Sequence, residues 1–103
     1  MPLQKLSILI PCYNEESMVV SILEKINNTD CGLSKEIIIV NDCSTDKTSK
    51  ELEKYIKINQ DTNIKLLHHP TNKGKGACIQ TALRVATGDV VIIQDADLEY
   101  NPD

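Results

Sequence analysis

The sequence of 103 residues contains no tryptophan and no phenylalanine, and only three tyrosines. The core of the protein must therefore be built from isoleucine, leucine and valine. No C-x-x-C pair occurs among Cys12, Cys31, Cys43 and Cys78, which argues against a zinc site and against a dithiol redox motif. Scattered cysteines are typical of reduced thiols in the cytoplasm, and a disulfide framework is the lesser alternative.

Positive charge and long apolar runs are also scarce. The chain has 11 basic and 15 acidic residues and a net charge of -4, which excludes a basic surface for nucleic acid. No apolar run approaches the ~18 residues of a membrane-spanning helix, and the N-terminal apolar patch is too short for a signal peptide. The length allows one domain, which we expect to be cytoplasmic.

Two kinds of apolar pattern alternate along the chain. Short apolar runs predict strands at 6–10, 36–40, 63–68 and 89–94, of which the first two should be buried and the third is the weakest. Apolar residues at helical spacing predict helices at 14–26, 44–58 and 73–86. We expect Pro11 to end the first strand, Asn14 to cap the first helix, and Ser44 or Thr45 to cap the second.

This alternation predicts an α/β fold with a parallel sheet and right-handed crossovers. In such sheets, ligands bind beyond the carboxyl ends of the strands. Three polar clusters, at 11–16, 41–46 and 95–99, each follow a predicted strand. We therefore expect all three clusters on one edge of the sheet.

The last of these clusters contains Asp95 and Asp97, which are two residues apart in an extended segment and can point the same way. Two carboxylates this close repel each other unless a cation lies between them, and Mg²⁺ and Mn²⁺ both suit oxygen ligands. Glu99 is positioned to join them. An isolated D-x-D pair is more often a pair of solvated acids, so the metal site depends on the surrounding pattern.

Asp42 ends the second predicted strand. At this position, nucleotide-binding sheets typically have an acid that contacts the ribose or the base. A turn or a helix cap is the alternative, and for Asp46 we favour that structural role. His68 and His69 are adjacent in a strand and would face opposite sides, so we interpret both as structural.

The segment from Lys73 to Gly76 (KGKG) opens the third predicted helix. Its glycines and lysines suit a phosphate at a helix N-terminus, and a loop with solvated lysines is an equally good interpretation. The P-loop pattern is absent. The dinucleotide pattern G-x-G-x-x-G is also absent, because PCYNEE follows the first strand instead.

Four motifs in this order and spacing resemble the nucleotide-binding half of family 2 glycosyltransferases, which have the GT-A fold. They are LSILIPCYNEE, IIIVNDCSTDKT, NKGKGACIQTAL and ATGDVVIIQDADLEYNP. The GKG loop and DADLEYNP resemble most the polyprenyl-phosphate (dolichyl-phosphate) mannosyl- and glucosyltransferases. The resemblance implies a Rossmann-like sheet with strand order 3-2-1-4, with residues 1–103 as the part that binds a nucleoside-diphosphate sugar.

The resemblance also implies roles for individual residues. Those that would bind the nucleotide sugar are Pro11, Tyr13, Glu15, Asp42, Lys75, Asp95, Ala96 and Asp97. Among them, Asp42 would contact the base and Lys75 would lie near the nucleotide or its phosphates. The metal, Mn²⁺ or Mg²⁺, would be held by Asp95, Asp97 and Glu99, with Asp97 the more direct ligand. Family members often have glutamine at the position of Glu99.

The implied reaction is metal-dependent, inverting transfer of a sugar from a UDP- or GDP-sugar to an acceptor, with polyprenyl phosphate as the suggested acceptor. In the family, the acceptor-binding half follows the D-x-D segment. We therefore expect a chain truncated after that motif, with no catalytic base of its own, that binds donor without turnover. The full-length protein would be associated with the cytoplasmic face of a membrane. An unpaired sheet edge would favour a homodimer or marginal stability.

Two other classes of protein share part of this pattern. A non-catalytic α/β interaction domain would keep the fold, but repelling acids such as Asp95 and Asp97 would be expected to disappear from a decayed site. A haloacid-dehalogenase-type phosphatase also carries D-x-D after a strand. That class places the motif on its first strand, with threonine or valine at the next alternate position, where this chain has Glu99.

Overall fold

The structure, a computed structural model, describes residues 4–15, 17–29, 32–60 and 62–94. The elements in these ranges alternate between strand and helix: β1 (Lys5–Cys12), α1 (Val19–Asn27), β2 (Ser34–Asn41), α2 (Thr48–Ile58), β3 (Ile64–His68), α3 (Lys75–Val85) and β4 (Val90–Ile93). The strands form one parallel sheet in the order β3-β2-β1-β4. The predicted fold class and strand order are therefore confirmed.

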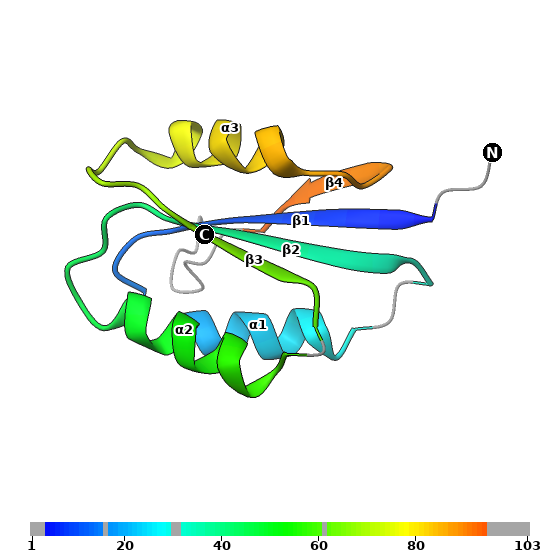
Figure 1. Cartoon of the computed structure of the whole chain (residues 1–103), viewed down its shortest axis with the longest axis horizontal. Helices are drawn as coiled ribbons and strands as arrows, with labels where there is room; N and C mark the ends of the chain where they lie inside the picture. Colours follow the sequence, from blue (N-terminus) through cyan, green and yellow to red (C-terminus); the bar gives the residue numbers. More distant parts are fainter. Residues whose placement is uncertain (1–3, 16, 30–31, 61, 95–103) are drawn as a thin grey trace, which may run out of the picture.

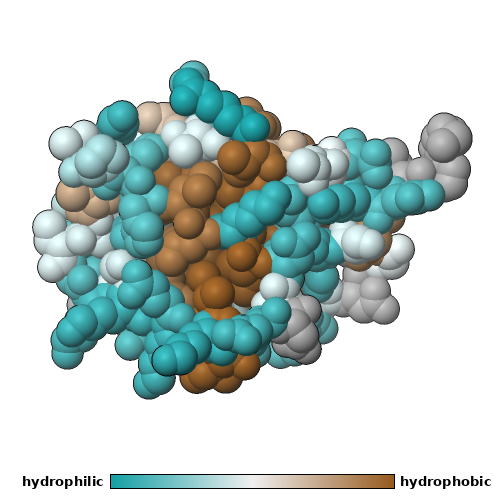
Figure 2. Space-filling model, viewed as in Figure 1, coloured by the Kyte–Doolittle hydropathy of each residue, from teal (hydrophilic) through white to brown (hydrophobic). Residues whose placement is uncertain are grey.

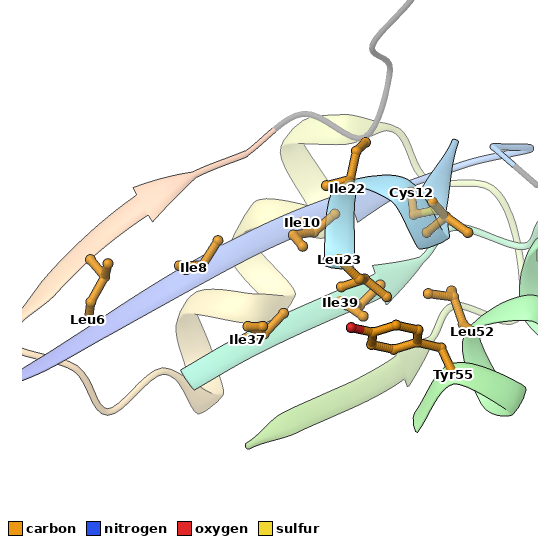
Figure 3. Packing of buried hydrophobic residues seen from close by; sticks show 11 residues of the cluster. Leu6, Ile8, Ile10, Cys12, Ile22, Leu23, Ile37, Ile39, Leu52 and Tyr55 are labelled. Carbon is orange, nitrogen blue, oxygen red and sulfur yellow. The ribbon is translucent and has the colours of Figure 1, made fainter. Parts of the chain in front are cut away.

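Helices cover both faces of the sheet (Figure 1), with α1 and α2 on one side and α3 on the other. Because side chains alternate along a strand, β1 sends Ile8 and Ile10 toward α1 and α2 (Figure 3) and Leu9 toward α3. Each such buried side chain contributes roughly 1.5–3 kcal/mol. The prediction of strands buried on both faces is confirmed for β1 and β2.

The strand β4 is more exposed than its apolar sequence suggests. Its side chains at Val91, Ile92 and Ile93 are 40%, 44% and 52% exposed. The only described strand that pairs with β4 is β1, so its other edge has no partner within residues 4–94. Figure 2 shows, in the same view as Figure 1, that apolar side chains also reach the surface across the middle of the molecule.

The expectation that Pro11 ends the first strand is wrong, because β1 continues to Cys12 and pairs with β2 over its whole length. The oxygen of Leu9 accepts a hydrogen bond from Gln94 N, so the backbone polar groups of Leu9 face β4. Pro11, two residues further on, faces the same side. Pairing with β2 therefore does not need the N–H that proline lacks.

Both of the first two helices begin later than predicted. Met18 and Lys47 occupy the N-cap positions of α1 and α2, and neither makes a side-chain cap hydrogen bond, so the predictions that Asn14, Ser44 or Thr45 cap a helix are wrong. Asn14 bonds instead to Ser44 and Thr45 of the loop after β2. The structural role favoured for Asp46 is confirmed, because its Oδ1 accepts from Thr48 N at 2.9 Å in the first turn of α2.

Candidate functional site

The carboxyl ends of the strands carry a pocket of about 230 Å³, at the end of the sheet where β1, β2 and β3 each connect to the following helix (Figure 1). Its lining comes from the end of β1 and the loop after it, the end of β2, and the start of α3. The residues concerned are Pro11, Cys12, Tyr13, Glu15, Asp42, Lys75 and Cys78. Five of the sequence-predicted binding residues thus come together in one place.

The other predicted site residues, Asp95, Ala96, Asp97 and Glu99, lie outside the described residues. The described chain ends at Gln94, whose N–H bonds to Leu9 O on the neighbouring strand β1. The metal assignment therefore stays a prediction.

Asn14 ties the loop after β1 to the loop after β2. Its backbone is left-handed, with φ 52°, a conformation that asparagine adopts more readily than most residues. Its Oδ1 accepts from Thr45 N at 2.8 Å, and its own N–H donates to Ser44 Oγ at 3.0 Å. Glu15 N donates to Thr48 Oγ1 at 2.8 Å, which fixes the backbone of Glu15 beside the pocket.

Asp42 lies at the base of the pocket, and its residue surface is only 3% exposed. Its Oδ1 accepts from Lys73 N and from His69 Nδ1, and its Oδ2 accepts from Gly74 N, each at 2.8 Å. Burial alone raises the pKa of this carboxyl, but these three donors outweigh burial and lower it. Asp42 is therefore an ionised group that only accepts hydrogen bonds.

His69 is buried and bonds through both ring nitrogens. Nδ1 contacts Asp42, and Nε2 lies 2.8 Å from Thr81 Oγ1 on α3. His68 is exposed, with Nδ1 3.2 Å from Asn41 Nδ2, so the two histidines do point to different surroundings. The sequence did not reveal the partner of His69, because Asp42 is 27 residues away in the chain.

The ligand atoms of Asp42, His69 and Cys78 all lie within 4.8 Å of one another. Both His69 nitrogens already take part in hydrogen bonds, and Asp42 accepts three. Burial raises the pKa of the Cys78 thiol to about 11, and burial raises that of Cys12 to about 12, so both thiols keep their protons at neutral pH. We therefore interpret this cluster as a hydrogen-bonded network.

Lys75 begins α3, and its exposed side chain lines the pocket. Gly74 before it has φ 94°, a conformation that a residue with a Cβ rarely adopts. The positive end of the α3 dipole and the Lys75 ammonium therefore lie at the same mouth of the pocket. An anionic ligand suits this arrangement, although direct contact with a phosphate stays a prediction.

Comparisons with known proteins identify sequence relatives of this chain. The sequence profile described as Glycosyl transferase family 2 matches residues 7–103. The dolichol-phosphate mannosyltransferase of Pyrococcus furiosus is 32% identical over 99 residues, which are 96% of this chain and 27% of that protein. The dolichyl-phosphate beta-glucosyltransferase of Mus musculus is 31% identical over 103 residues, covering 93% of this chain and 32% of that protein.

Solved structures with the same fold contain nucleotide sugars. The mannosyltransferase PcManGT from Pyrobaculum calidifontis, in complex with GDP-Man and Mn²⁺, has a TM-score of 0.84 and 31% identity, over 89% of this chain and 27% of that one. S. aureus TarS 1-349, in complex with UDP-GlcNAc, has a TM-score of 0.78 and 33% identity, over 91% of this chain and 27% of that one.

The chain thus spans less than a third of the length of these relatives. In the part of the chain that the structure describes, no helix has the length and apolar character needed to cross a membrane. The family profile covers nearly the whole sequence, and the fold agrees with that of a related mannosyltransferase. The chain belongs to glycosyl transferase family 2, the family that its motifs resemble.

Proposed function

We propose that the pocket binds the nucleoside diphosphate of a donor sugar for metal-dependent, inverting glycosyl transfer. The observation that carries this proposal is that Pro11, Tyr13, Glu15, Asp42 and Lys75 all line the same pocket. The GDP-Man and UDP-GlcNAc in the related structures support a ligand of this class.

The chemistry of Asp42 favours particular bases. A carboxylate offers about four lone-pair positions. Three of them accept the N–H groups described, and the fourth accepts from the Cys78 thiol, a weak donor that the N–H of a base would replace. Uracil and guanine present a ring N–H that an acceptor-only group can bind, whereas cytosine and adenine present a ring acceptor at the matching edge. Tyr13, whose surface is 44% exposed, offers a ring face beside such a base. The donor is accordingly a UDP- or GDP-sugar.

The diphosphate would lie near Lys75 and the N-terminus of α3, because both favour negative charge. Asp95, Asp97 and Glu99 supply hard oxygen donors, which fit Mn²⁺ or Mg²⁺. A bound cation of this kind would offset the charge of the leaving diphosphate. The Mn²⁺ in the PcManGT complex supports a divalent cation.

The acceptor we propose is a polyprenyl phosphate, in line with the dolichol- and dolichyl-phosphate transferases among the relatives. A phosphate acceptor is already ionised, so it needs no strong general base. Residues 1–103 would bind the donor without turning it over. The whole protein would act at the cytoplasmic face of a membrane.

Calorimetric titration of the chain with UDP, GDP, CDP and ADP, with and without Mn²⁺, tests this proposal. We expect UDP or GDP to bind in the presence of Mn²⁺, at least about tenfold more tightly than CDP and ADP, from the difference of one hydrogen bond to a charged group. Asp97→Ala should abolish the effect of Mn²⁺ on nucleotide affinity. The control Glu53→Ala, at an exposed position on α2, should leave that effect unchanged. Equal affinity for all four nucleotides, or unchanged Mn²⁺ dependence in Asp97→Ala, would overturn the proposal.

A further inference from the structure

A chain of hydrogen bonds joins the end of β2 to α3 across the residue that follows β3. Asp42 Oδ1 lies 2.8 Å from His69 Nδ1, and His69 Nε2 lies 2.8 Å from Thr81 Oγ1. His69 and Asp42 are buried, with 8% and 3% of their residue surfaces exposed. The imidazole therefore has little freedom to turn.

The contact with Asp42 fixes what His69 Nδ1 does. An ionised carboxylate accepts only, so His69 Nδ1 must carry the hydrogen. Nε2 is paired with the Thr81 hydroxyl, which can either donate or accept. Neither ring nitrogen remains for a ligand, and His69 does not line the pocket. His69 can therefore affect ligand binding only indirectly, through its hydrogen-bond partners Asp42 and Thr81.

Asp42, held by His69, in turn binds the backbone of the turn before α3. Its two carboxylate oxygens accept from the backbone N–H groups of Lys73 and Gly74, both at 2.8 Å. Lys75, the next residue, begins α3 and lines the pocket. A rotation of the Asp42 carboxylate would weaken both hydrogen bonds to the turn.

We propose that His69 is a positioning residue for the nucleotide pocket, acting through Asp42 to hold the turn that places Lys75 and the N-terminus of α3. This inference rests on the proposed function for its ligand. The holding of the turn itself is a property of the protein alone. Two separate measurements can therefore examine the two parts.

Three variants of His69 separate its two hydrogen bonds. His69→Asn keeps an amide N–H near the place of Nδ1 and so retains a donor for Asp42. His69→Gln reaches the place of Nε2 and retains a partner for Thr81, and His69→Leu keeps neither. His68→Leu, at the exposed neighbouring histidine, is the matched control.

The first measurement is backbone amide hydrogen exchange at Lys73 and Gly74. We expect faster exchange at both amides in His69→Leu and His69→Gln, and near-native exchange in His69→Asn and His68→Leu. If His69 only filled space, the smallest of the three replacements, asparagine, would not give the exchange rates closest to those of the native chain. Unchanged exchange in His69→Leu, or equal exchange in the asparagine and leucine variants, would overturn the proposal.

The second measurement is the affinity for UDP and GDP in the presence of Mn²⁺. We expect His69→Leu to weaken binding about tenfold or more, the effect of losing a hydrogen bond to a charged group, and His69→Asn to weaken it less. Lys75→Ala should cost less affinity in His69→Leu than in the native chain, because the two residues act together.

Additive losses from His69→Leu and Lys75→Ala would show that His69 does not act through the turn. A native chain that binds neither nucleotide would contradict the proposed function and the nucleotide-positioning role together. In that case the exchange data alone would still decide whether His69 holds the turn. Failure of the positioning role and failure of the proposed function therefore give different results.

Discussion

Glu36 on β2 and Lys65 on β3 form an ion pair, with Nζ 2.9 Å from Oε1 of a carboxylate that is fully buried. The same carboxylate accepts from Ser7 Oγ on β1 at 2.7 Å and from Thr87 N, before β4, at 2.9 Å. One acidic side chain therefore connects β1, β2 and β3 with the segment that precedes β4. It lies at the opposite end of the strands from the pocket, and it helps to set where β4 begins.

We expect Glu36→Gln to destabilise the protein by roughly 3 kcal/mol, because an amide in place of this buried, ionised carboxylate leaves the donors around it poorly matched. Glu51→Gln, at a half-buried position on α2 away from this network, is the matched control and should change stability little. Urea unfolding measures both free energies. A loss as small as that of the control would show that the buried carboxylate and its partners contribute nothing to stability.

The same network predicts how stability depends on pH. Burial alone raises the pKa of Glu36, but the hydrogen bonds from Lys65, Thr87 and Ser7 hold it far below its ordinary value of 4.5. A carboxyl with a depressed pKa in the folded state stabilises the protein above its unfolded pKa and loses that effect as the pH falls. The free energy of unfolding should therefore decrease below about pH 4.5 in the native chain, and less steeply in Glu36→Gln.

Gly88 lies against β1 so closely that no larger residue fits. A Cβ at this position would lie 2.5 Å from Ser7 Oγ and 2.7 Å from Ser7 N. The backbone contact cannot be relieved by a rotation of the serine side chain. We expect Gly88→Ala to cost roughly 1–3 kcal/mol, the usual range for overpacking.

Gly76, inside α3, is the control for that substitution, because a Cβ there would meet nothing within 4 Å. Gly76→Ala should stabilise the chain by up to about 1 kcal/mol through helix propensity. Thermal unfolding of the two variants compares these effects directly. A Gly88→Ala protein as stable as the native chain would contradict the packing of the α3–β4 turn against β1.

Asn14 is expected to stabilise the pocket edge in two ways that substitution can separate. Asn14→Gly removes the hydrogen bond to Thr45 but tolerates φ 52°, and should cost about 1 kcal/mol. Asn14→Ala also strains the left-handed backbone and should cost about 1 kcal/mol more. Chemical denaturation measures both. The prediction fails if alanine is tolerated as well as glycine.

The outer edge of β4 leads us to propose that residues 1–103 form a homodimer through this strand. Val91, Ile92 and Ile93 are exposed β-branched residues beside an edge that has no described partner, and such edges pair readily with another strand. Sedimentation velocity should show a dimer in the native chain and a monomer in Ile92→Lys. A native chain that stays monomeric at all concentrations would contradict this proposal.

The sequence was sufficient to predict the parts of the fold that depend on local pattern. β-Branched runs and helical periodicity located every described strand and helix to within a few residues. The rule that parallel strands present ligands at their carboxyl ends predicted that the clusters at 11–16 and 41–46 would share one edge of the sheet, and the resemblance singled out the five pocket residues. Resemblance to the family supplied the strand order and the individual roles.

Contacts between distant residues were not predictable in the same way. Asp42 and His69 are 27 residues apart, and Ser7 and Glu36 are 29 apart, so no periodicity relates them. Asn14 looked like a helix cap because asparagine suits both a cap and a left-handed turn. Only the three-dimensional arrangement shows that it bonds to the β2–α2 loop instead of to α1.

The most direct test of the account is paramagnetic broadening of backbone amide signals by Mn²⁺ in the presence of UDP or GDP. Mn²⁺ held beside a nucleotide should broaden the signals of Tyr13, Asp42 and Lys75 strongly, and those of Lys35 and Thr62, at the far end of the sheet, much less. Broadening should disappear without the nucleotide. Broadening centred elsewhere, or unaffected by the nucleotide, would contradict the assignment of this pocket as the donor site.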